Sequence, residues 1–232
     1  MGIFDWLFGK SKNGSGDIPA NDNQNVSEKI IVYSSIEEQD GQTYEWKQYN
    51  DGSWSMESDI GEPFKSYFEL SEIIVREKDI YKKLEACEKS FDILSQVMKL
   101  ERNQVGKIPD SIACRDYAPK LYMRLGQWSN AVSAIKKCIK TKAYLDKEWG
   151  KNMLEYCEIY KQTVEIAINF LRDNEGFLQK NIYKALADTN VDTDCLKDFT
   201  RSSLLIKKVK KGGTNQLFLN EDVILQSEVN IS

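Results

Sequence analysis

Apolar residues recur at helical spacing through the middle of the chain, starting at about residue 65. Between residues 80 and 98 they are spaced by four and three, which places them on one stripe of a helix of about five turns. The members of this stripe are Ile80, Leu84, Cys87, Phe91, Leu94 and Met98. The spacing lasts for about three heptads, so we expect packing inside a helical domain rather than a coiled coil. A loop is expected at residues 103–110, which contain Gly106 and Pro109.

Two more helices are predicted on either side of Gly126, and a third, long helix follows them. The apolar face of the first helix comprises Tyr117, Leu121 and Leu125, widened by Ala118 and Tyr122. The stripe of the second comprises Trp128, Ala131, Val132, Ile135, Cys138 and Ile139. The long helix, at about residues 147–171, carries Met153, Cys157, Tyr160, Val164, Ala167 and Leu171.

The hairpin around Gly126 resembles the tetratricopeptide (TPR) motif. The matching positions are Tyr122, Gly126 at the turn, Trp128, Ala131, Ile135 and Cys138. The match covers one helical hairpin of about 25 residues, and the Pro that usually follows the second helix is missing. In that family the concave face of stacked hairpins binds peptides. The resemblance therefore implies a TPR-like region, although one hairpin does not make such a groove.

Strands are predicted before the helices, at residues 28–58. Ile30 to Tyr33 is a short β-branched run, and alternating side chains flank Asn50-Asp51-Gly52 further along. Asp-Gly between two such runs is a strong signal of a β-hairpin. In a simple register four large side chains share one face of this hairpin. They are Tyr44, Trp46, Trp54 and Met56. Their most common role is to hold a small sheet together, and a ligand-binding aromatic face is the alternative.

The C-terminal part, from about residue 165 to residue 220, resembles the winged helix-turn-helix. It follows the order helix, short strand at Phe177-Leu178, helix to Leu186, helix at 193–204, and hairpin around Gly212-Gly213. In members that bind DNA, the helix at 193–204 lies in the major groove and the hairpin, or wing, lies against phosphates. The resemblance implies these DNA-binding candidates: Lys197, Thr200, Arg201, Lys207, Lys208, Lys210 and Lys211.

Charge both supports and opposes this interpretation. The chain has a formal net charge of −4, but residues 180–216 contain eight Lys or Arg and four Asp. Such asymmetry indicates a nucleic-acid face, an acidic-partner face or a solvated surface. Asp194 and Asp198 lie on the predicted DNA-reading helix and would repel phosphates. Winged helices also serve as protein-binding modules, and the alternative role of the wing lysines is to keep a sheet edge soluble.

The chain starts with an apolar leader on a polar tether, residues 1–27. Its docking candidates are Phe4, Trp6, Leu7 and Phe8. An apolar tip of this kind docks on a membrane surface, here through residues 1–10, or in a groove of a partner. The alternatives are a disordered start and a tip that folds back on its own domain. No run of about 18 apolar residues occurs, so no membrane span is predicted.

Composition argues against most enzyme chemistry. The chain has no His, which removes His-assisted Ser or Cys catalysis and His-containing zinc sites. Its five cysteines include no CxxC pair, and we interpret them as buried reduced thiols of a cytoplasmic protein. No phosphate-binding glycine motif and no complete calcium loop occurs. We therefore expect no cofactor, no metal and no small-molecule substrate, which leaves open only a carboxylate site assembled from distant residues.

Together these patterns predict a mainly α protein. The predicted divisions are the leader, a small β element at 28–64, a TPR-like helical domain at 65–162, a winged-helix domain at 163–222 and a tail at 223–232. The favoured hypothesis is a non-catalytic regulatory or adaptor protein, whose winged helix contacts DNA and whose helical middle contacts a protein partner. The alternative is a scaffold whose winged helix contacts only proteins, with the leader as an optional membrane anchor.

Overall fold

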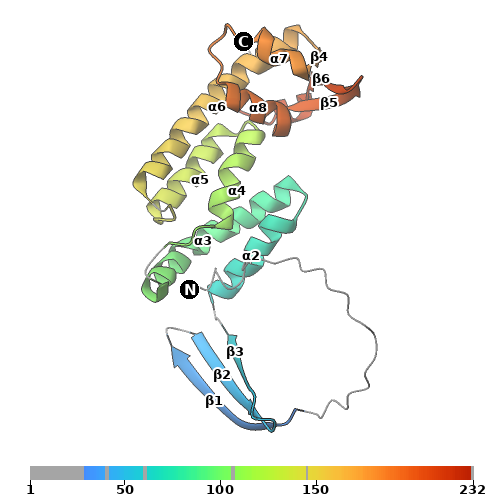
Figure 1. Cartoon of the computed structure of the whole chain (residues 1–232). Helices are drawn as coiled ribbons and strands as arrows, with labels where there is room; N and C mark the ends of the chain where they lie inside the picture. Colours follow the sequence, from blue (N-terminus) through green and yellow to red (C-terminus); the bar gives the residue numbers. More distant parts are fainter. Residues whose placement is uncertain (1–28, 40–41, 60–61, 106–107, 145, 231–232) are drawn as a thin grey trace, which may run out of the picture.

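The computed structural model describes residues 29–39, 42–59, 62–105, 108–144 and 146–230. The chain is mainly helical and contains two small antiparallel sheets, as the sequence predicts (Figure 1). The leader, with its docking candidates Phe4, Trp6, Leu7 and Phe8, lies outside the described residues. Within the described ranges, no helix combines the length and the apolar character needed to cross a bilayer.

The first sheet has three strands in the order β1 (Ile31–Gln39), β2 (Gln42–Tyr49) and β3 (Trp54–Asp59). The predicted hairpin is confirmed: the Asp51 carboxylate accepts a hydrogen bond of 2.9 Å from the Ser53 N–H in its turn. The register pairs Trp46 with Met56 and Gln48 with Trp54, so Tyr44, Trp46 and Trp54 lie on one face of the sheet, as predicted. Strand β1 extends the hairpin to a meander.

The helical middle comprises five helices. They are α2 (Phe64–Arg76), α3 (Ile80–Val105), α4 (Ala113–Arg124), α5 (Trp128–Lys140) and α6 (Lys147–Asp173). The predicted stripe of α3 is confirmed, because its members from Leu84 to Met98 are buried in the core. The helix runs to Val105, so the following loop starts later than the predicted residue 103. All five cysteines are free and buried, as predicted.

The C-terminal part contains α7 (Gln179–Ala185), α8 (Thr193–Ser202) and a second sheet. The strands are β4 (Phe177–Leu178), β5 (Ile206–Lys211) and β6 (Thr214–Leu219), and β6 lies between the other two. Helix α8 begins at Thr193 because the Asp192 carboxylate caps it, accepting hydrogen bonds from the N–H groups of Asp194 and Cys195. It ends at Ser202, two residues before the predicted end.

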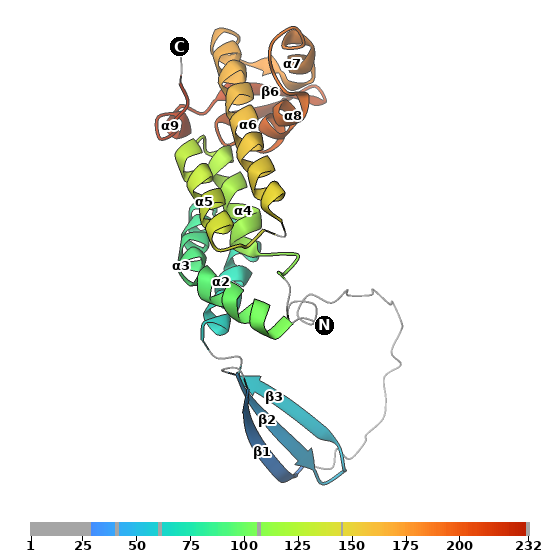
Figure 2. The same ribbon diagram turned by 90° about the vertical axis from the view of Figure 1, so that its left-hand side faces the viewer.

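Helix α6 connects the helical middle to this C-terminal part. It packs against α5 along one stretch and against α8 along another (Figure 2). The predicted division at residue 162 therefore falls inside a continuous helix. The buried Cys157, Tyr160, Val164 and Leu171 follow one another along its inner side. The two regions share one core through α6, so movement of one against the other would require this helix to bend or break.

The last described residues fold back onto the turn between α4 and α5. A short helix, α9 (Glu221–Ile224), buries Ile224, and the Glu228 N–H then donates a hydrogen bond of 2.8 Å to the Gly126 carbonyl. The predicted tail at 223–232 is therefore packed as far as Val229, which lies partly buried against the core. Gly126 has a φ of 69°, and a Cβ built there would lie 2.9 Å from the Ser227 Cβ. Glycine thus ends the helix and admits the tail.

Candidate nucleic-acid interface

Helix α8 exposes only one narrow side to solvent. Cys195, Leu196 and Phe199 are buried against the rest of the C-terminal part. At 3.6 residues per turn, the opposite side carries Asp194, Lys197 and Arg201, all of which are exposed. Thr193 at the start of α8 is exposed as well, and Asp198 is partly exposed one turn before Arg201, so α8 offers charges of both signs to a partner.

Thr200 does not belong to this exposed side, so its prediction as an outward DNA contact is wrong. The residue has no exposed surface. Its hydroxyl lies 2.8 Å from the Tyr183 hydroxyl of α7 and donates a hydrogen bond to the Lys197 carbonyl. The sequence contained the signal for this outcome, because residue 200 follows Leu196 by four positions and therefore lies on the buried stripe.

Lys197 is exposed but its charge is already paired. Its Nζ lies 2.8 Å from the Asp194 Oδ1, one turn earlier on the same helix. The hydrogen bond to Asp194, together with the attraction of that carboxylate, raises the pKa of Lys197 above its usual range. The pair presents one positive and one negative group side by side, so it attracts phosphate less than a free lysine would.

The four wing lysines divide between two faces of β5. Successive side chains of a strand point to opposite faces, so Lys208 and Lys210 share the face of Ile206, whereas Lys207 and Lys211 lie on the other. Ile206 is buried, which turns the face of Lys208 toward the body of the C-terminal part. The Lys207 Nζ lies 3.7 Å from the Asp222 Oδ2 of α9. The four wing lysines therefore do not form a single surface.

One hydrogen bond joins the wing to α8. The Lys208 Nζ donates to the Arg201 carbonyl at 2.5 Å, at the C-terminal end of α8. Partial burial lowers the pKa of this ammonium group. The Lys208 ammonium group thus lies at the end of α8 that carries the exposed Arg201, and Lys210 follows it on the same face of β5. We name Arg201, Lys208 and Lys210 the α8–β5 surface.

Nucleophilic and metal chemistry find little support in the described residues. Burial raises the pKa of the Cys87, Cys138 and Cys195 thiols to about 12, so these groups stay protonated and unreactive near neutral pH. In the ranges that the structure describes, no group of three or more Cys, Asp or Glu side chains is placed to hold a metal ion. Buried Arg115 has a structural role: it donates to the Ala143 and Asp110 carbonyls.

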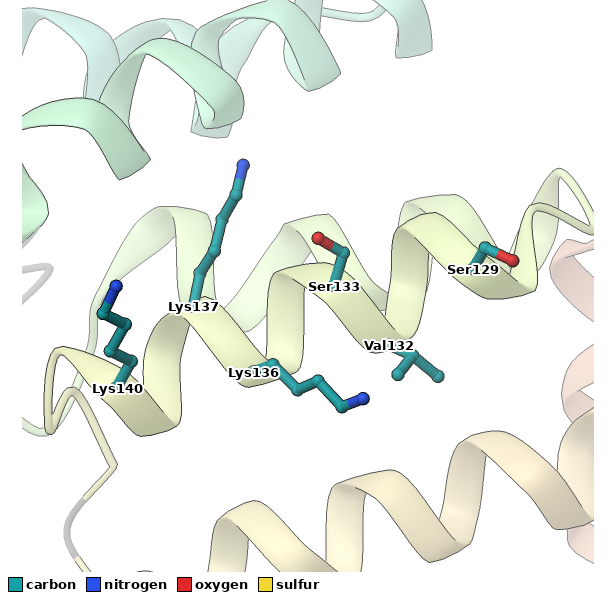
Figure 3. A pocket seen from close by; sticks show the side chains of 6 residues that line it. All are labelled: Ser129, Val132, Ser133, Lys136, Lys137 and Lys140. Carbon is teal, nitrogen blue, oxygen red and sulfur yellow. The ribbon is translucent and has the colours of Figure 1, made fainter.

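A second cationic area was not predicted from the sequence. A groove of about 530 Å³ runs along α5, and we name it the α5 groove (Figure 3). Its lining residues are Ser129, Val132, Ser133, Lys136, Lys137 and Lys140. Once the buried stripe of α5 is assigned, these positions lie on the outside, together with the exposed Asn130 and Ile139. The signal was thus available, but only after the packing of the helix was known.

In comparisons with known proteins, no family model, no curated protein and no solved structure matches the chain.

Proposed function

We propose that the protein is a non-catalytic adaptor. Its C-terminal part adopts the winged-helix arrangement and contacts the phosphates of duplex DNA, and its helical middle contacts a protein partner. The element order α6, β4, α7, α8, β5, β6 supports the winged-helix assignment, as does the position of β6 between β4 and β5. The hairpin of α4 and α5, which turns at Gly126, supports a TPR-like middle.

The hydrogen bond between Lys208 and the Arg201 carbonyl carries the DNA proposal. It places the Lys208 ammonium group at the end of α8, and Lys210 follows Lys208 on the same face of β5. Basic groups on one side can meet successive phosphates of a duplex, and such contacts supply most of the sequence-independent affinity.

The contact we propose does not read base sequence. Of the exposed α8 side chains, Lys197 is paired with Asp194, which leaves Arg201 as the free donor. Three cations neutralise about three phosphates, so the logarithm of the binding constant should fall with the logarithm of salt concentration at a slope of about −3. This slope is shallow, and the affinity we expect at physiological salt is accordingly weak.

A pair of charge reversals tests the proposal in the full chain. The Arg201→Glu/Lys210→Glu variant should weaken binding to a fluorescein-labelled duplex by at least about tenfold and flatten the salt slope. The Lys207→Glu/Lys211→Glu variant is the matched control, because it changes the net charge equally on the opposite face of β5. At about 0.15 M salt the Debye length is about 8 Å, so the control should lose much less affinity.

The second candidate is a scaffold whose winged helix contacts only proteins. The pairing of Lys197 with Asp194 favours it, and so does the position of Lys207 beside Asp222, because both reduce the positive field. Absence of DNA binding at low salt, or equal losses in the two charge-reversal variants, would remove the DNA contact and leave the scaffold.

A further inference from the structure

We propose that the α5 groove binds an acidic segment of a partner protein. This proposal deepens the adaptor function and rests on its protein-binding half, but it does not depend on the DNA contact. The groove follows the exposed side of α5, and its lining residues recur at spacings of three and four along the helix. An elongated segment can therefore lie along the helix and meet the same side at every turn.

The charge of the groove is positive and largely unmatched. Helix α5 contains no Asp or Glu. The charge of Lys137 is already matched, because its Nζ lies 2.5 Å from the Glu88 Oε2 of α3. The same Nζ lies 5.0 Å from the centre of the Phe91 ring. Over the described ranges, no ion pair reaches Lys136 or Lys140, and both are exposed. Two ammonium groups therefore remain to be matched by an occupant.

The cations lie on both sides of the helix axis. In Figure 3, Lys137 and Lys140 extend on one side of α5, and Lys136 and Val132 extend on the other. An occupant placed along the exposed side of α5 can thus be held by ammonium groups at both of its edges. The favourable interaction of cations with the C-terminal end of a helix accounts for lysines in the last turn. It does not account for the serine and valine side chains that continue the groove toward Ser129.

The chain itself shows that one end of the groove accepts a carboxylate. The Glu228 side chain accepts hydrogen bonds of 2.9 Å from the Ser129 N–H and 2.8 Å from the Ser129 Oγ. This carboxylate comes from the folded-back segment that also contacts Gly126. Glu228 satisfies the first turn of α5 only, so the lysines further along are left for a second acidic group. The half-exposed Val132 lies between these polar ends and offers contact to an apolar side chain.

These features favour an acidic peptide over nucleic acid. Val132 and the partly exposed Ile139 add apolar surface beside the lysines, which phosphates would leave unused. Peptides that dock on a helical groove combine an apolar anchor with matching charges. A partner segment with Glu or Asp on two successive turns and an apolar residue between them fits this arrangement.

The test uses the full chain and a synthetic probe. The probe is a fluorescein-labelled helical peptide of about the length of α5, with Glu on successive turns and Leu between them. A matched peptide has Gln in place of Glu. We expect the Glu peptide to bind at least about tenfold more tightly than the Gln peptide in fluorescence anisotropy. Equal affinities for the two peptides would overturn the proposal.

Charge reversal in the protein locates the site. The Lys136→Glu/Lys140→Glu variant should lose at least about tenfold in affinity for the Glu peptide and should gain affinity for a peptide with Lys in place of Glu. The Lys180→Glu/Lys184→Glu variant is the matched control, because both lysines are exposed and four residues apart on α7. Equal losses in both variants would show that only the net charge matters, and would overturn the proposal.

Different results would overturn the acidic-partner proposal for the α5 groove and the DNA proposal for the α8–β5 surface. Displacement of the Glu peptide by duplex DNA, with loss of DNA affinity in the Lys136→Glu/Lys140→Glu variant, would assign the groove to nucleic acid and overturn the acidic-partner proposal. A normal peptide affinity in the Arg201→Glu/Lys210→Glu variant supports a groove that is independent of the α8–β5 surface.

Discussion

The two sheets of this protein are both three-stranded and antiparallel, yet they have different surroundings. The meander β1-β2-β3 consists of strands that follow one another in the chain, and no described helix packs extensively against it (Figure 1). The sheet β4-β6-β5 joins strands that α7 and α8 separate in the sequence, and α6 and α7 pack against its central strand.

The large side chains differ accordingly. In the meander Tyr33 and Trp54 contact each other at 6.0 Å between ring centres, but each stays 53% exposed. In the C-terminal sheet Leu217 is fully buried, and the ring centres of Phe177 of β4 and Phe170 of α6 lie 5.0 Å apart. Alternating apolar and polar residues and a turn signal are therefore enough to form a sheet. Only helices that bring a second apolar layer bury one of its faces.

The largest expected effect comes from the central strand of the covered sheet. Leu217→Ala should lower the free energy of unfolding by about 3 kcal/mol, because it removes a fully buried side chain and leaves a cavity. The measurement is chemical denaturation followed by helical circular dichroism. The matched change in the uncovered sheet, Trp54→Ala, should shift this helical transition by less than about 1 kcal/mol. Equal shifts would show that the two sheets are covered alike.

The next largest effect on stability is expected at Gly126, where the C-terminal segment packs. Gly126→Ala should destabilise the protein by about 2 to 3 kcal/mol, because it adds strain at positive φ and a clash with the Ser227 Cβ. Gly213, in the turn between β5 and β6, also has a positive φ of 81° but has no atom within 4 Å of an added Cβ. Gly213→Ala should therefore cost only about 1 kcal/mol. Thermal melts of the two variants separate the strain at positive φ, which both share, from the clash with Ser227, which only Gly126→Ala introduces. Similar losses of stability would contradict the packing of the C-terminal segment against Gly126.

Burial also changes the ionisation of one acidic residue, Glu101 of α3. This residue is only 1% exposed, and burial raises its pKa from 4.5 to about 7. The folded state then keeps a proton that the unfolded chain loses, so the contribution of Glu101 to stability is most favourable below about pH 4.5 and decreases as the pH rises to about 7.

Glu101→Gln should remove this decrease and stabilise the protein at pH 8 by about 2 to 3 kcal/mol, because a pKa difference of one corresponds to about 1.4 kcal/mol. Denaturation curves of the wild type and the variant at a series of pH values provide the measurement. The Glu148→Gln change serves as the control, because it removes a carboxylate that is exposed rather than buried. A pH-independent difference between wild type and Glu101→Gln would contradict the raised pKa.

The smallest expected effect is at the exposed side of α8. Asp194→Asn removes the partner of Lys197, and the loss of an exposed pair should cost less than about 0.5 kcal/mol in stability. Freed from its carboxylate, Lys197 should strengthen DNA binding by a few-fold, measured by the same duplex titration at low salt. Unchanged affinity would indicate that this side of α8 does not meet phosphates.

Local pattern determined much of the architecture. The stripe of α3, the hairpin with Asp51-Gly52 in its turn, the break at Gly126 and the wing at Gly212-Gly213 all follow from periodicity and turn chemistry, which act within a few residues. The burial of Thr200 was also readable from its spacing after Leu196, although its hydroxyl suggested an outward contact. The order of elements in the C-terminal part could likewise be predicted from the chain alone.

Tertiary structure decided which of these residues act together. Lys208 reaches the end of α8 while Lys207 lies beside Asp222, because the burial of Ile206 orients the strand. Glu228 meets Ser129 across 99 positions of the chain, and no local pattern encodes that contact. Helices, hairpins and turns can thus be predicted from the chain, since their energies depend on near neighbours. The cationic surfaces were decided only by the packing of distant segments, because charges act through space rather than along the chain.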